Sequence, residues 1–135
     1  MDSNQPSEIR PTILLVDKDE STRNLYHREL RRTFRVIVCQ NDEEALHFAG
    51  TEHADVLIFG LRPPFNLGWE LLHRLQKIMP DVETPIVIYS GVEPHEFRET
   101  LPHATLLVQP VLPAVLNETI RQKLQSIGWH PSPSV

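Results

Sequence analysis

The chain alternates short apolar runs with helical patterns, and this alternation restricts its fold more than any other feature. The runs are four to six residues long and end at turn residues; they are Thr12–Val16, Phe34–Cys39, Asp55–Phe59, Pro85–Tyr89 and Thr105–Val108. Such runs are typical of strands buried on both faces of a sheet. Connections that contain a helix join parallel strands. The pattern therefore predicts an α/β fold with a five-stranded parallel sheet that is covered on both faces.

Helical patterns occupy the connections between the runs. Their predicted limits are Asp19 or Ser21 to about Arg32, about 43–51 after a cap at Asn41 or Asp42, Leu67 to Pro80, 94–101, and Leu112 to Gly128. In the last helix Pro113 lies in the first turn, where its missing N–H costs nothing. The predicted buried stripe of this helix is Leu112, Leu116, Ile120, Leu124 and Ile127.

Length and composition indicate one domain and exclude several classes of protein. The 135 residues are enough for a single core, with a flexible tail expected over 1–10, a domain over 11–127 and a C-terminal tail over 128–135. The net charge of −5 argues against a nucleic-acid binder. No apolar run approaches the roughly 18 residues of a membrane helix, and residues 1–10 have no signal-peptide core. The single Cys39 fits a cytoplasmic chain.

Four stretches, taken in order, resemble a known family. They read ILLVDKDE (13–20), DVLIFGLRPPFNLGWELL (55–72), PIVIYSG (85–91) and LLVQP (106–110). Together they resemble the receiver domain of two-component response regulators, the CheY-like superfamily, over nearly the whole of 11–126. The resemblance implies a flavodoxin-like (βα)5 fold, which is a three-layer sandwich with strand order 2-1-3-4-5.

The resemblance also implies a phosphorylation pocket, and this chain departs from the family pattern there. The family uses an aspartate nucleophile on the third strand, where this chain has Gly60. Of the two acids that bind Mg²⁺ after the first strand, Asp17 is kept and the second is Lys18. The hydroxyl after the fourth strand is kept as Ser90, and the lysine before the proline is Gln109.

These replacements predict a pocket without covalent chemistry, and the chain is not expected to be an enzyme. A glycine cannot form an aspartyl phosphate, and Mg²⁺ prefers hard oxygen ligands that are mostly missing here. We therefore expect no cofactor, with Asp17 and Asp19 as weak candidates for a metal. At the switch position, where the family has an aromatic residue, this chain has Leu106. The resemblance also implies a cis peptide bond before Pro110.

Two basic residues near the pocket have open roles. The Lys18 ammonium lies either beside Asp17, in place of the metal, or in solvent. Arg62, two residues after Gly60, is expected to be a solvated loop residue, with a position over the pocket as the alternative.

The function indicated by these residues is that of a stand-alone pseudo-receiver in two-component phosphorelay signalling, acting by protein–protein interaction without phosphorylation. Its expected partner is a protein such as a sensor histidine kinase, with no nucleic acid or membrane, and homodimerisation is left open. Two alternatives are a small-ligand sensor that uses the emptied pocket and a receiver phosphorylated at a non-standard residue.

Overall fold

The computed structural model describes residues 9–81, 83–92, 101 and 104–130, and in it the five apolar runs form one parallel sheet. The strands pair in the order β2-β1-β3-β4-β5. They comprise β1 (Thr12–Val16), β2 (Arg35–Cys39), β3 (Val56–Leu61), β4 (Ile86–Ser90) and β5 (Ala104–Val108). This arrangement confirms the predicted flavodoxin-like fold class.

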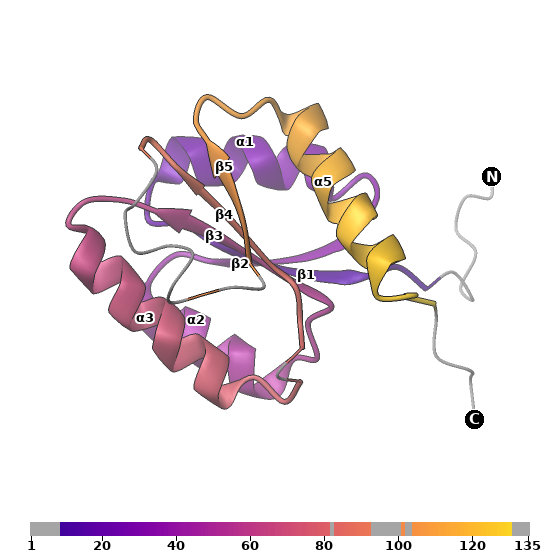
Figure 1. Ribbon diagram of the computed structural model, residues 1–135, viewed down its shortest axis with the longest axis horizontal. Coiled ribbons are helices and arrows are strands. Elements are labelled where there is room, and N and C mark those ends of the chain that lie inside the picture. The colour runs from indigo at the N-terminus through magenta and orange to yellow at the C-terminus, as the bar shows by residue number, and fades with distance from the viewer. Residues whose placement is uncertain (1–8, 82, 93–100, 102–103, 131–135) are drawn as a thin grey trace.

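Helices cover both faces of the sheet, and this makes the three layers seen in Figure 1. The helices of the described residues are α1 (Glu20–Leu30), α2 (Asp42–Thr51), α3 (Phe65–Ile78) and α5 (Pro113–Ser126). On one face α1 and α5 pack against an apolar cluster that includes Ile13, Ile58 and Val87. On the other face α2 and α3 cover a second cluster around Leu57 and Ile88. The burial of β1 and β4 at every position follows from this double covering.

The strand register brings the carboxyl ends of β1, β3 and β4 to one edge of the sheet. Val16 is opposite Phe59, and Gly60 is opposite Tyr89. The third strand extends to Leu61, beyond its predicted end at Phe59, so Gly60 lies inside β3. The residue after β1, Asp17, therefore lies near Gly60 and Tyr89 although they are far apart in sequence.

Side-chain caps fix the starts of the first two helices as the sequence predicts. The Asp19 carboxylate accepts a hydrogen bond from the Thr22 N–H, and the Asn41 amide oxygen accepts one from Glu44. The third helix begins at Phe65, earlier than the predicted Leu67. Its regular apolar spacing starts only after the first turn, which explains the late prediction.

The last helix buries a shorter apolar stripe than predicted. Leu116, Ile120 and Leu124 are buried, whereas Leu112 and Ile127 are 67% and 49% exposed. Leu112 is the N-cap and Ile127 the C-cap of α5. The prediction was wrong for these two residues because the backbone leaves the helical path at both ends, so the side chains leave the buried face.

Some predictions lie partly or wholly outside the described residues. The predicted helix over 94–101 does so except for Leu101, as do most of the two predicted tails. Within the described part, Trp129 packs against the α1–α5 side of the core. The domain boundaries therefore stay predictions. Among the described residues, no helix has the length and apolar character needed to span a membrane.

Candidate functional site

The carboxylate of Asp17 is the centre of the candidate site, at the carboxyl edge of the sheet. Its side chain is completely buried. Each of its two oxygens accepts two hydrogen bonds. Oδ1 accepts one from Arg62 Nε at 2.6 Å and one from the Asp19 N–H at 2.9 Å. Oδ2 accepts one from Arg62 Nη2 at 2.9 Å and one from the Tyr89 hydroxyl at 2.5 Å. A buried carboxylate is tolerated only when it is paired and hydrogen-bonded, and these contacts meet that requirement.

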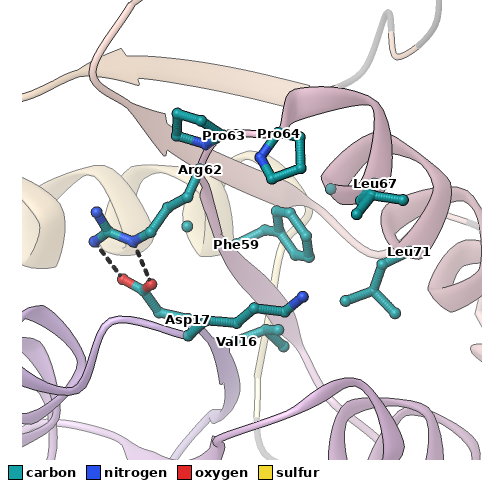
Figure 2. Close-up of a pocket in the computed structure, with 11 residues that line it drawn as sticks. Val16, Asp17, Phe59, Arg62, Pro63, Pro64, Leu67 and Leu71 are labelled. Carbon is teal, nitrogen blue, oxygen red and sulfur yellow. Dashed lines mark hydrogen bonds and ion pairs between the residues drawn. The ribbon is translucent and has the colours of Figure 1, made fainter.

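Arg62 supplies the positive charge of this site. Figure 2 shows its guanidinium side by side with the Asp17 carboxylate, in the two-point geometry of a strong charge-assisted pair. The prediction of a solvated loop residue was wrong, because the Arg62 side chain is only 29% exposed. The hydrogen bonds to Asp17 raise the pKa of Arg62 above its usual range, against the opposing effect of burial.

Tyr89 provides the third member of what we call the Asp17 cluster, which consists of Asp17, Arg62 and Tyr89. The tyrosine is fully buried on β4, and its ring meets that of Tyr26 edge-on with centroids 5.0 Å apart. Burial raises the pKa of Tyr89 far above its usual value, and the charge of Asp17 raises it further. The hydroxyl therefore stays protonated and donates to Asp17.

Gly60 leaves the space that the Asp17 cluster occupies. A Cβ atom at this position would lie 2.7 Å from both Cγ and Oδ2 of Asp17 and 2.9 Å from Cε1 of Tyr89. Side chains held by several hydrogen bonds in a packed core cannot easily move away. Glycine is thus needed here because of close side-chain approach.

Lys18 and Asp19, which follow Asp17, both have partners outside the pocket centre. The Lys18 ammonium is 3.3 Å from Asp42 Oδ1 in an exposed ion pair. The hypothesis that it sits on Asp17 is therefore wrong, and Arg62 holds that place. Asp19 caps α1, and its hydrogen bond from Thr22 lowers its pKa.

The remaining predicted site residues are Ser90, Gln109 and Leu106, and their contacts are separate from those of the Asp17 carboxylate. Ser90 is fully buried, and its Oγ accepts a hydrogen bond from the Val92 N–H at 3.3 Å. The Gln109 N–H donates to the Ser90 carbonyl, and the predicted cis peptide bond before Pro110 is confirmed. The predicted switch position, Leu106, is partly buried against the α2–α3 side of the core.

A small cavity lies beside the cluster, under the start of α3. Its volume is about 60 Å³, and it is lined by Lys18 and Gly60 as well as by the apolar residues that Figure 2 labels. Sites for drug-sized ligands are usually several hundred Å³. The cavity has room for a small group only, and neither Ser90 nor Gln109 lines it.

The site is an ion pair between Asp17 and Arg62 in which both carboxylate oxygens are fully hydrogen-bonded. Position 60 offers no nucleophile, and within the part of the chain that the structure describes no group of three His, Cys, Asp or Glu residues is arranged to hold a metal ion. A magnesium ion needs free oxygen ligands, but both Asp17 oxygens are engaged by two donors each. The residues present therefore do not fit the magnesium ion that the resemblance implies.

Sequence reasoning gave Arg62 a position over the pocket only as an alternative, and it missed the role of Tyr89. One clue was present, because a tyrosine within a buried apolar run needs a hydrogen-bond partner for its hydroxyl. Tyr89 stands in such a run, and Asp17 was already expected at the same edge of the sheet. No comparable pattern marks Arg62, which follows Leu61 at the end of β3 and precedes two prolines.

Comparison with known proteins defines the class to which this fold belongs. Several solved receiver domains match most of the chain. The chemotaxis protein CheY4 of Vibrio cholerae is 23% identical with a TM-score of 0.74, the match covering 85% of this chain and 99% of that one. A CheY-like receiver domain protein of Methanospirillum hungatei is 24% identical, with a TM-score of 0.74 and coverage of 87% and 95%.

A somewhat higher identity is found with the receiver domain of the hybrid histidine kinase CckA. It is 29% identical with a TM-score of 0.68, and the match covers 84% of this chain and 99% of that domain. No protein-family model matches the chain, and no curated protein gives a significant match. The chain thus has the fold of CheY-like response regulator receiver domains.

Proposed function

We propose that this protein is a receiver-fold module of two-component signalling that works by protein–protein contact and is not phosphorylated. The fold supports the first half of this proposal, since the matched structures include a chemotaxis protein and the receiver of a histidine kinase. Its partner would be a protein such as a sensor histidine kinase, in the cytoplasm, and the module itself would catalyse no reaction.

The observation that carries the second half is the filled space at Gly60. An acceptor side chain at this position would overlap the Asp17 carboxylate and the Tyr89 ring. The missing carboxylate is therefore not the only difference from a phosphorylation pocket. The side chains of Asp17 and Tyr89 also occupy the space that an acceptor at position 60 would need. A ligand-sensing function receives less support, since the cavity is only about 60 Å³.

The proposal is tested by binding to a sensor kinase with and without a phosphoryl mimic. The affinity for the dimerisation domain of a candidate kinase is measured by calorimetry, with Mg²⁺ alone and with Mg²⁺ plus beryllofluoride. We expect the same Kd in both conditions, and no mass increase after incubation with acetyl phosphate. A phosphorylated species, or a Kd that changes with beryllofluoride, would contradict the proposal.

The matched variant is Gly60→Asp, which supplies the carboxylate that the sequence lacks. Because the space is occupied, we expect this variant to remain unphosphorylated and to be less stable than the natural chain. Phosphorylation of Gly60→Asp would mean that the pocket still holds the other groups that the reaction requires.

A further inference from the structure

The buried acid of the Asp17 cluster has its positive partner within the chain. Arg62 donates two hydrogen bonds to Asp17, and its Nη2 lies 4.0 Å from Asp19 Oδ2. One guanidinium thus lies between two acids that follow the same strand. In a protein that bound a divalent cation here, the ion would have to occupy this space.

We propose that Arg62 is a built-in counter-ion that excludes divalent cations from this pocket, and that its removal turns Asp17 and Asp19 into a divalent-cation site. The inference rests on the proposed function in one respect: both assume that the pocket binds neither a phosphoryl group nor a metal ion. It does not involve a partner protein.

Three features of the pair distinguish it from an ordinary surface contact. The Asp17 side chain is completely buried, so its charge needs a close partner. The Arg62–Asp17 contact has two points, which fixes the orientation of both groups. The Tyr89 hydroxyl and the Asp19 N–H fill the remaining acceptor positions of the carboxylate.

The chain also offers a matched control in Lys18. This cation adjoins Asp17 in sequence and lines the same cavity, but its ammonium pairs with Asp42. The side chains of that pair are 63% and 47% exposed. Exposed pairs contribute little to stability, so removing Lys18 tests the loss of a nearby charge without loss of the buried contact.

The experiment measures melting temperature for the natural chain, Arg62→Ala and Lys18→Ala. Each is measured without divalent ions, with millimolar MgCl₂ or MnCl₂, and with NaCl at matched ionic strength. We expect Arg62→Ala to melt on the order of 10 °C lower than the natural chain, because a buried charge loses its partner. We expect divalent salt, but not NaCl, to restore part of this loss, and to leave the natural chain and Lys18→Ala unchanged.

Two further variants keep the inference testable where Arg62→Ala does not fold. Asp17→Asn combined with Arg62→Ala removes both charges, and it should melt higher than Arg62→Ala alone and show no response to divalent ions. Arg62→Gln removes the charge but keeps a polar side chain, and it should gain the response to Mg²⁺ or Mn²⁺.

The outcomes separate this inference from the proposed function. A rise in the melting temperature of the natural chain with Mg²⁺ would overturn it, as would an Arg62→Ala variant as stable as Lys18→Ala. Absence of a divalent response in both Arg62→Ala and Arg62→Gln would also overturn it. None of these results depends on kinase affinity, which tests the proposed function alone.

Discussion

The position of the Asp17 carboxylate depends on the absence of a side chain at Gly60. The carboxylate and the Tyr89 ring take the volume in which a Cβ atom at position 60 would lie. Without the glycine, the hydroxyl of Tyr89 and the Asp17 carboxylate could not meet at their present separation. A buried acid, a cation and a phenol thus pack together beside Gly60.

Replacing Gly60 by alanine should lower the stability of the fold, whereas the same change at Gly50 should raise it. Gly60→Ala should destabilise the fold by roughly 1–3 kcal/mol, as overpacking of a core does. Gly50, in α2, has no atom within 4 Å of a built Cβ. Gly50→Ala should therefore stabilise by up to about 1 kcal/mol through helix propensity. Urea unfolding measures both, and a neutral Gly60→Ala would show that the cluster moves freely.

At the scale of elements, the start of α1 connects helix capping to the site. The Asp19 side chain caps the helix, while its N–H donates to Asp17 Oδ1. The next helix, α2, begins with an uncharged cap, Asn41. The N-cap side chains of α1 and α2 therefore make the same kind of hydrogen bond, but only the cap of α1 can be protonated in acid.

This difference predicts the effect of acid on stability. The hydrogen bond from Thr22 lowers the pKa of Asp19 below its ordinary value of 3.8, so at a pH between these two pKa values the unfolded chain binds more protons than the folded chain. The stabilisation from Asp19 is present above pH 3.8 and is lost as pH falls through the lowered value. Asp19→Asn should keep the cap at neutral pH and give a shallower loss of stability in acid.

The control for this prediction is Asn41→Ala. It removes a cap that does not titrate, so it should cost about 1 kcal/mol at every pH without changing the slope. Unfolding free energies measured by urea titration from neutral pH into acid check both variants. An unchanged acid slope in Asp19→Asn would contradict the assignment of this proton-linked stability to Asp19.

At the scale of the whole molecule, helices on both faces bury the sheet and shield its one cysteine. Cys39 ends β2 and is completely buried among residues of the α2–α3 side of the core. Burial raises the pKa of its thiol to about 12. The thiolate, which is the reactive form, is therefore scarce in the folded chain at ordinary pH.

The thiol thus reports on global unfolding. Near pH 8, a thiol reagent should modify Cys39 slowly in native buffer and rapidly in denaturant. The urea midpoint of labelling should coincide with that of circular dichroism. A Cys39→Ser variant is the control for nonspecific reaction. Rapid labelling under native conditions would mean that the β2 edge opens locally without unfolding of the sheet.

The amino-acid pattern was enough to predict the five strands, their parallel arrangement and a glycine at position 60 at the carboxyl edge of the sheet. These features are local, because apolar runs, caps and turn residues act over a few positions. In contrast, only the folded structure could identify the partners of Asp17. Its partners Arg62 and Tyr89 are 45 and 72 positions away in sequence. The register of neighbouring strands and the packing around Gly60 bring these side chains together, and no local pattern encodes which cation reaches a buried acid.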